Sequence, residues 1–506
     1  MQASNRIIVN TLAQYCRTII NLLLSLYSAR LVLDILGVED FGIYSLVAGV
    51  VSMLSFLTNS LVTSTQRFLS VSQGTNNLER LKEVFCNSLV LHVVLGLIIT
   101  LALECLTPLL FNGFLNIPDG RDTAAVIIYQ QVIFMVYVSF IASPYRALLV
   151  SRENIVYTSI VDVLDGVLKL VLVIALIYLP YDKLVAYGWI MFAIRISNLL
   201  AFAIYTHFKY EECILPKVKY LKYSYVKELS SFTGWIMYSS GCIALRNQGF
   251  AIVLNKTLGT AINAAYGIGA QIAGMVSFVS SSFNNALAPQ LMAAKGGGNS
   301  ERMWQLSYIE CKISFLLLAM VAIPTMFEMQ ALLELWLKEV PQSSMMFGCM
   351  FLSMQTIDLL TTGLGTVNRA TGKIGMYTLA TFTPKLFALP LCWIVLYFDY
   401  SLLYACLIVV LIETISMLLR IPMIRKAQGF NSWDFISNVI LKVIPPVILS
   451  VLICVLITIS VDSSFRFILT YMVAIPLFAF AVYKFSLNEV ECNKLKSIVS
   501  ALREKI

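Results

Sequence analysis

Apolar stretches long enough to cross a lipid bilayer as helices occupy almost the whole of this chain. Hydrophobic residues make up 59% of the 506 residues, charged residues make up only 13%, and the mean hydropathy is +0.82. A soluble domain carries about 25% charged residues, and a membrane-spanning helix needs roughly 20 consecutive apolar residues. The composition therefore excludes a soluble globular fold and predicts an all-α polytopic membrane protein.

Fourteen spans are expected, joined by short connections of which 209–227 is the longest. None of the connections could hold a soluble domain. We predict helices over residues 7–33, 40–64, 83–105, 124–144, 154–179, 184–207, 228–253, 263–287, 304–326, 343–366, 373–397, 401–424, 439–461 and 464–485.

Basic residues in the connections indicate the orientation. If the N-terminus, the C-terminus and each loop after an even-numbered span share one side, that side holds 22 lysines and arginines, Arg67 and Arg146 among them, and the other side holds five. Cytoplasmic loops are rich in Lys and Arg, so both termini are predicted in the cytoplasm. Met1 to Arg6 reads as a short cytoplasmic tail because no signal-peptide cleavage site follows it.

An internal repeat relates two halves of the chain at an offset of 222 residues without a gap. LGVEDFGIYSLVAGVVSMLSF (36–56) aligns with LGTAINAAYGIGAQIAGMVSF (258–278), and G-x-x-N-x-E-R recurs at 74–80 and 296–302. The offset spans six helices, which predicts two parallel halves, as in transporters that bind substrate between such halves. The expected domains are a six-helix lobe (1–208), a cytoplasmic linker (209–227), a second six-helix lobe (228–426), two additional helices (439–485) and a cytoplasmic tail (486–506).

One polar helix face in each half predicts a shared central cavity. The spacing of three and four residues places each set on a single face. The sets are Ser45, Gly49, Ser52, Asn59, Thr63 and Gln66 in the second span, and Gly267, Gln271, Gly274, Ser281, Asn285 and Ala288 in the eighth.

Charged residues near the middle of several spans are expected to face that cavity or a partner, because a charge at the bilayer centre costs roughly 3 kcal/mol. Arginine forks onto phosphate oxygens, so a cationic cavity suits a large hydrophilic anion such as an oligosaccharide diphosphate whose lipid tail stays in the bilayer. The candidate substrate-binding residues are Arg17, Asn21, Lys169, Arg195, Arg246 and Lys385, and the candidate ion-coupling carboxylates are Asp162, Asp165, Asp358 and Glu413.

Several of these charges have a structural alternative. Asp165 and Lys169 could neutralise each other within one helix, and Arg195 and Arg246 could form interhelical pairs instead of lining the cavity. Arg30 and Arg420 lie near predicted helix ends and are expected to snorkel toward headgroups. Transport driven by an ion gradient and energy-independent flipping both remain open.

Other function classes lack their motifs. The eleven cysteines are scattered without a CxxC pair, there are two histidines and no HExxH, and no GxxxxGK[ST] nucleotide motif occurs. No metal site or cofactor is therefore expected. The net charge of +8 is explained by the cytoplasmic loops rather than by nucleic-acid binding. A membrane glycan polymerase or ligase typically has a long external catalytic loop, which this chain lacks. No lipid-facing GxxxG run stands out, so a monomer is expected.

The run LDILGVEDFGIYSL at 33–46, with an early arginine in span one, resembles the polysaccharide exporter branch of the multidrug/oligosaccharidyl-lipid/polysaccharide (MOP) flippase superfamily. The chain is similar over its whole length to O-antigen (Wzx-type) flippases. This resemblance implies two six-helix lobes, often with two extra helices. It also implies transfer of undecaprenyl-diphosphate-linked glycans across the bacterial cytoplasmic membrane, with polysaccharide polymerase and chain-length machinery as partners. It further implies that Arg17, Arg67 and Arg246 contact the diphosphate, although span eight contains no arginine.

Two other functions are compatible with the same superfamily. A cation-coupled multidrug extruder would need a carboxylate deep in span one or seven, where this chain has Arg17 and Arg246 instead. Lipid II is a second alternative, because it also carries a diphosphate.

Overall fold

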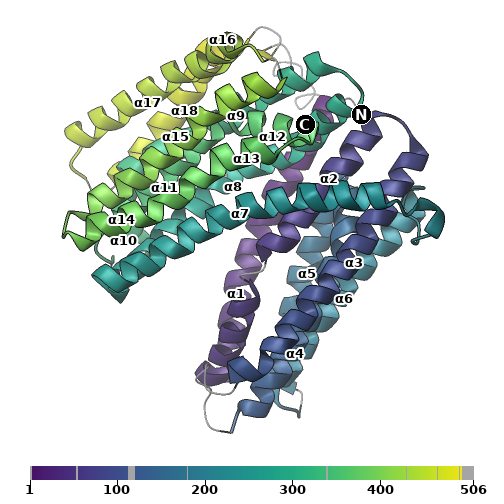
Figure 1. The fold of residues 1–506 in the computed structure, drawn as a ribbon. Helices are drawn as coiled ribbons and strands as arrows, with labels where there is room; N and C mark the ends of the chain where they lie inside the picture. Colours follow the sequence, from purple (N-terminus) through teal and green to yellow (C-terminus); the bar gives the residue numbers. More distant parts are fainter. Residues whose placement is uncertain are drawn as a thin grey trace, which may run out of the picture. The chain divides into compact units, whose positions relative to one another are not determined.

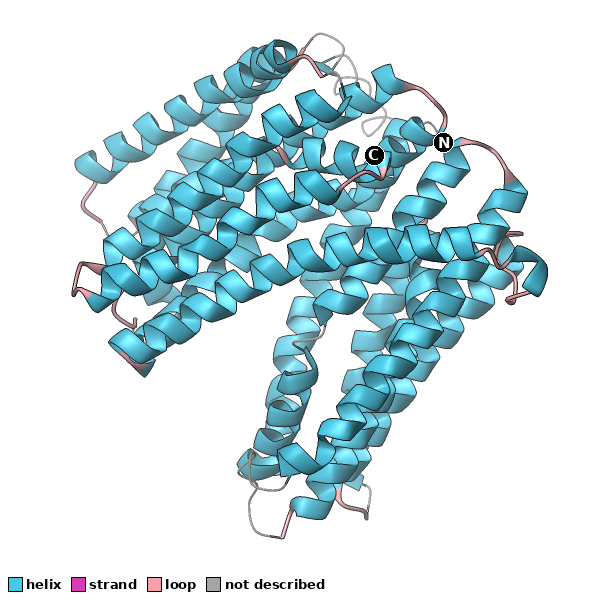
Figure 2. Ribbon diagram, in the orientation of Figure 1, coloured by secondary structure: helices cyan, strands magenta, loops and turns pink. Residues whose placement is uncertain are grey.

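The computed structural model describes residues 3–52, 55–111, 120–178, 180–337, 340–428, 430–463, 465–488 and 491–492. Throughout these residues every regular element is a helix (Figure 2). Nine helices in the described ranges are long and apolar enough to cross a membrane, which confirms an all-α, multi-pass protein. They are Leu78–Leu109, Asp122–Ser151, Lys183–Lys209, Ile262–Gly296, Ser300–Phe327, Gly375–Tyr397, Leu402–Lys426, Ser432–Ser460 and Arg466–Ser486.

The chain forms two compact units. The N-terminal unit comprises Arg6–Met237 and Met292–Gly298, and the C-terminal unit includes Tyr238–Leu291 and the described residues from Asn299 onward. The boundary falls within one helix, α7, ten residues beyond the predicted start of the second lobe at 228. Helices α1 to α6 are Ala3–Ser52, Ser55–Gly74, Leu78–Leu109, Asp122–Ser151, Ile155–Ala175 and Lys183–Lys209 (Figure 1).

The second half of the chain contains more and shorter helices than the first. From α7 to α18 they are Tyr223–Leu258, Thr260–Gly296, Ser300–Phe327, Met329–Trp336, Ser344–Leu359, Thr362–Thr371, Gly375–Phe382, Ala388–Tyr397, Leu402–Gln428, Ser432–Phe435, Leu441–Ser460 and Arg466–Ala481 (Figure 1). The short helix α10 was not predicted. Helix α7 begins at Tyr223, so the connection predicted at 209–227 is shorter, because the helix extends past its apolar stretch.

A single glycine separates the first two predicted spans. Helix α1 runs to Ser52 with one non-helical residue, Gly37 (φ 79°, ψ 171°), a conformation that glycine adopts at little steric cost. Gly259, its counterpart at the offset of 222, also has a positive φ of 87° and separates α7 from α8. The six-residue loop expected at 34–39 is therefore mostly helical.

An ion-pair cluster joins the starts of α4 and α6 to the part of α1 that follows its break. Arg121 binds Asp40, which follows the Gly37 break, and also Asp182 at 2.6 Å. Asp182 caps α6 by accepting a hydrogen bond from the N–H of Val185. Burial acts to raise the pKa of Asp182, but the hydrogen bonds from Val185 and Arg121 outweigh it and hold the pKa below its usual value.

Two asparagines that lie 222 residues apart cap the starts of α3 and α9. Asn77 accepts a hydrogen bond from the N–H of Arg80 at the start of α3, and Asn299 accepts one from Arg302 at the start of α9, each at 3.0 Å. A glutamate follows in each first turn, where a negative charge complements the helix dipole. The recurring G-x-x-N-x-E-R pattern is thus a helix-start signal that lies outside the apolar segments.

The last two long helices pack within the C-terminal unit. Helices α17 and α18 lie against each other and against α9, with Phe315, Val443 and Phe478 in their common core. Two ion pairs tie α9 to this region. Glu328 accepts from Arg466 at 3.0 Å, and the buried Lys312 donates to Glu491 at 2.6 Å. Part of the predicted tail 486–506 therefore contacts the helices, and residues 493–506 lie outside the described ranges.

Candidate functional site

Two helical segments of the C-terminal unit are interrupted partway along their length. Helix α11 ends at Leu359 and α12 begins at Thr362, so the predicted span 343–366 is broken. A 3₁₀ turn, Thr383–Phe387, separates α13 from α14 and contains Pro384, which lacks an N–H and interrupts the helical ladder. Such breaks release backbone groups from their helical partners, and in transporters they are found at ion and substrate sites.

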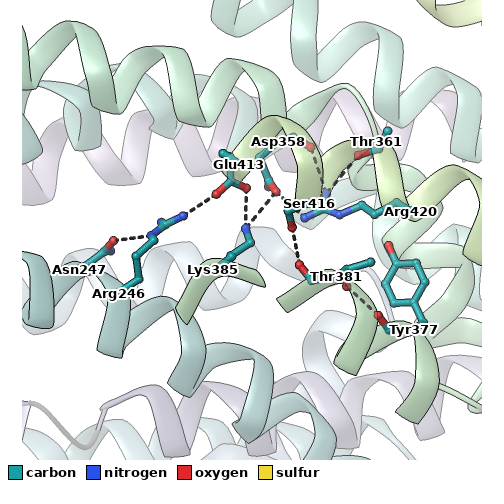
Figure 3. Close-up of polar contacts among 10 residues, drawn as sticks. All are labelled: Arg246, Asn247, Asp358, Thr361, Tyr377, Thr381, Lys385, Glu413, Ser416 and Arg420. Atoms are coloured by element: carbon teal, nitrogen blue, oxygen red, sulfur yellow. Dashed lines mark hydrogen bonds and ion pairs between the residues drawn. The ribbon is translucent and has the colours of Figure 1, made fainter. Parts of the chain in front are cut away.

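Five charged side chains meet beside these breaks and form the C-terminal network: Arg246, Asp358, Lys385, Glu413 and Arg420 (Figure 3). Glu413 accepts from Arg246 and, at 2.5 Å, from Lys385. Asp358 accepts from Arg420 at 2.5 Å, and its carboxylate lies 3.8 Å from the ammonium of Lys385. Ion pairs thus join the 3₁₀ turn to helices α7, α11 and α15.

The C-terminal network is largely closed to solvent. The exposed fraction of the side chain is 2% for Glu413, 3% for Lys385, 6% for Arg420 and 8% for Arg246, and it rises to 38% only for Asp358. Three cations face two carboxylates, so each carboxylate lies between two cations. The predicted substrate-binding residues Arg246 and Lys385 are therefore already paired with the predicted ion-coupling residue Glu413.

A second group, the N-terminal network, consists of Arg17, Arg146 and Asp162. The carboxylate of Asp162 on α5 accepts from Arg17 of α1 at 2.8 Å and from both ends of the Arg146 fork on α4 at 2.9 and 2.7 Å. The exposed fractions of these side chains are 22% for Arg17, 35% for Arg146 and 16% for Asp162. Unlike the side chains of the C-terminal arginines, those of Arg17 and Arg146 remain partly accessible.

Asp165 has a different environment from the other three predicted carboxylates. Its carboxylate accepts a hydrogen bond from the amide of Asn198 on α6 at 2.7 Å. Although Lys169 lies one turn away, no ion pair joins these two described residues, so the intrahelical alternative is not observed. Arg195 interacts electrostatically with both Asp165 and Lys169, but no ion pair joins Asp165 to a cation among the described residues.

Two further candidates lie in the N-terminal unit. The side-chain oxygen of Asn21 on α1 lies against Gly166 of α5, between Asp162 and Lys169 in sequence. Arg67 lies within α2, not in a loop as expected. Its guanidinium packs on the rings of Phe68 and Phe232, at 4.4 and 5.1 Å, and lies 3.8 Å from Glu228.

Three side chains that bind the predicted carboxylates were not expected to do so from the sequence. Arg420 was expected to snorkel, but it is buried against Asp358, and its spacing of seven residues from Glu413 on one helix face was the available signal. Arg146 was assigned to a loop but lies inside α4, and Asn198 was not singled out. The partners of these last two lie on other helices, and no local pattern encodes them. The side chain of Arg30 lies outside the described residues.

The polar face of α8 is exposed at Gln271, Ser281 and Asn285. The matching face of the second span lies partly outside the described side chains, but Asn59 is also exposed. Exposed polar side chains on long membrane helices are unfavourable against lipid, so both faces are suited to contact with water or a hydrophilic solute.

Comparisons with known proteins agree with this architecture. Residues 4–294 match the model of a family described as polysaccharide biosynthesis protein. The chain is 20% identical over 320 residues to an uncharacterized membrane protein, EpsK, of Bacillus subtilis (strain 168), and the match covers 62% of each protein. The chain therefore spans less than two thirds of the length of that relative.

Solved transporter structures share the fold. A mutant of the Vibrio cholerae MATE transporter VcmN superposes with a TM-score of 0.73 at 18% identity, covering 85% of this chain and 98% of that one. A MOP superfamily transporter from Pyrococcus furiosus gives a TM-score of 0.70 at 14% identity, covering 84% and 96%. Because the family model matches more than half of the chain, the chain belongs to the polysaccharide biosynthesis protein family.

Proposed function

We propose that this protein moves an undecaprenyl-diphosphate-linked oligosaccharide, an O-antigen or capsule repeat unit, across the bacterial cytoplasmic membrane by alternating access. The observation that carries the proposal is the N-terminal network, in which two accessible arginines share one carboxylate. Arginine binds phosphate with the same bidentate geometry that it uses for carboxylate. A diphosphate could therefore replace Asp162 on one or both guanidinium groups.

We further propose that fourteen spans form the transport path. Twelve of them make up two parallel six-helix halves, residues 1–208 and 228–426, two additional helices follow at 439–485, and both termini lie in the cytoplasm. The positive-φ glycines Gly37 and Gly259 and the capping pair Asn77 and Asn299 support the repeat. Substrate contacts are proposed at Arg17, Asn21, Arg67, Lys169, Arg195, Arg246 and Lys385. Polysaccharide polymerase and chain-length machinery would take up the product.

We assign ion coupling, where it operates, to Asp165. Asp162, Asp358 and Glu413 each already lie beside two cations, so a coupling ion would have to displace a side chain to bind there. Asp165 instead accepts from the neutral amide of Asn198 and forms no ion pair with another described residue, so a coupling ion could reach its carboxylate without displacing a paired cation.

Replacing both accessible arginines should abolish transport. In a strain deleted for its O-antigen flippase, the wild-type chain should restore surface glycan. Arg17→Ala and Arg146→Ala should each reduce the amount of surface glycan at least about tenfold, because each removes a charge-assisted bond that contributes roughly 1.4 kcal/mol or more. Arg17→Lys should retain an intermediate level because lysine keeps the charge but not the fork. The exposed Arg80 on α3 provides the matched control, with Arg80→Ala remaining active.

Binding to the purified protein separates cargo from transport. A polyprenyl diphosphate should bind wild type and Arg80→Ala, and bind Arg17→Ala more weakly. Undiminished binding and transport in the double variant Arg17→Ala/Arg146→Ala would refute the diphosphate site. Drug or dye resistance conferred by a chain that binds no diphosphate would instead favour the multidrug extruder.

Removing the Asp165 carboxyl should uncouple transport from its driving gradient. Asp165→Asn is nearly isosteric and can still bond to Asn198, so the fold should be retained. In proteoliposomes, the wild-type rate should fall at least fivefold when the proton and sodium gradients are collapsed, and the Asp165→Asn rate should be low and unaffected. A wild-type rate that does not depend on any gradient would eliminate ion coupling and leave energy-independent flipping.

A further inference from the structure

The broken end of α11 provides a set of oxygen atoms arranged around one position. The carboxylate of Asp358 lies in the last turn of this helix, and the hydroxyl of Thr361 lies at the break. The last carbonyls of a helix have no intrahelical donor and carry a partial negative charge. Together, a carboxylate, a hydroxyl and a helix C-terminus create an environment that favours a cation.

Arg420 already fills this position. Its guanidinium donates to the Asp358 carboxylate at 2.5 Å, to the backbone carbonyl of Asp358 at 3.2 Å and to the Thr361 hydroxyl at 3.2 Å (Figure 3). The three oxygens therefore converge on one cation that the chain itself supplies from α15. The other nearby cation, Lys385, is directed to Glu413, at 2.5 Å, and lies 3.8 Å from Asp358.

Oxygens of these three types are the ligands of small hard cations in proteins. In transporters with broken helices, unwound carbonyls and half-helix C-termini coordinate sodium ions or protons. We propose that Arg420 is a tethered cation that takes the place of a mobile monovalent ion at the end of α11. The C-terminal unit then holds its broken helix together without an ion from solution, and removal of the guanidinium charge creates a sodium-sized site.

The distribution of cations around Asp358 supports the same assignment. With Arg420, three cations face two carboxylates, and without it Asp358 keeps only Lys385, at a distance of 3.8 Å. A sodium ion bound to the three oxygens would again give the Asp358 carboxylate a cation in direct contact. The consequence for energy coupling rests on the proposed function: a coupling ion would bind in the N-terminal unit, at Asp165, and not at Asp358 or Glu413.

Binding of ²²Na⁺ to the purified full-length chain tests the tethered cation without any transported cargo. All chains carry Asp165→Asn, so that the proposed coupling site does not contribute. The chain with Arg420 intact should bind no sodium, whereas Arg420→Gln should gain about one saturable site per chain. That site should be lost again when Asp358→Asn is added. Arg420→Lys, which keeps a tethered cation, is the matched control and should bind no sodium.

The thermal midpoint gives a second readout. In choline chloride the midpoint of Arg420→Gln should fall below that of Arg420→Lys, and NaCl at equal ionic strength should recover most of the difference. Sodium binding by the chain with Arg420 intact, if lost on Asp358→Asn, would overturn the proposal. So would an Arg420→Gln chain that binds no sodium, or one that does not fold in NaCl while Arg420→Lys does. These sodium-binding results do not depend on which cargo the protein transports, so they would be the same if the proposed diphosphate cargo were wrong.

Discussion

Glu413→Gln should destabilise the protein by about 3–5 kcal/mol, the usual cost of leaving a buried charge without its partner. The carboxylate is 2% exposed and is the acceptor for both Arg246 and Lys385. A neutral amide would leave these two buried cations beside Arg420, with Asp358 as the only carboxylate in the C-terminal network. The expected result is a large fall in the yield of folded protein and in the thermal unfolding midpoint measured in detergent.

A double variant and a surface pair provide the controls. Glu413→Gln/Lys385→Met removes one of the two stranded cations and should recover part of the lost stability. Glu79→Gln removes a carboxylate that is 60% exposed, lies 3.6 Å from Lys82 and sits in the first turn of α3, and it should cost no more than about 1 kcal/mol. If Glu413→Gln unfolds at the same midpoint as Glu79→Gln, the network does not stabilise the C-terminal unit.

Gly296→Ala should be the most damaging glycine substitution in α8. The last turns of α2 and α8 touch through their backbones: a Cβ on Gly296 would lie 1.9 Å from the carbonyl oxygen of Val71, and one on Gly74 would lie 2.1 Å from that of Ala293. Backbone atoms cannot rotate out of the way as a side chain can. We expect a loss of about 3 kcal/mol or more, at the upper end of the cost of overpacking, visible as a lowered unfolding midpoint.

Gly267→Ala is the matched control in the same helix. No heavy atom lies within 4 Å of a Cβ placed on Gly267, and alanine is favoured over glycine in a helix by up to about 1 kcal/mol. This variant should be neutral or slightly stabilising. Equal midpoints for the two variants would show that α2 and α8 do not need to approach so closely.

The repeat pattern indicated where these close contacts lie but not what they are. Gly74 and Gly296 lie at the predicted repeat offset of 222 residues, and the alignment drew attention to them because both are glycine. That their backbones touch is a property of helix packing, and no spacing within either segment encodes it. The capping residues Asn77 and Asn299 were likewise visible as a shared motif, and their role became clear only from their hydrogen bonds to Arg80 and Arg302.

The charged sites divide in the same way. Deep charges such as Arg17, Asp162, Arg246 and Glu413 could be identified from the sequence because a bilayer makes any charge in an apolar run conspicuous. Their pairing could not be predicted, since the partners lie far apart in the chain: Arg17 and Asp162 are 145 residues apart, and Arg246 and Glu413 are 167 residues apart.

The sequence by itself determined that this protein is an all-α membrane protein and that it resembles polysaccharide exporters. It did so because the bilayer demands long apolar helices whatever their packing, and because the motif at 33–46 is local. Only the tertiary structure decided which charges are accessible and which are neutralised. Arg420, expected near headgroups, is buried at a broken helix, and Arg146, expected in a loop, shares Asp162 with Arg17. Burial and charge pairing depend on the neighbouring helices, and those neighbours are fixed by packing, not by the order of residues within one segment.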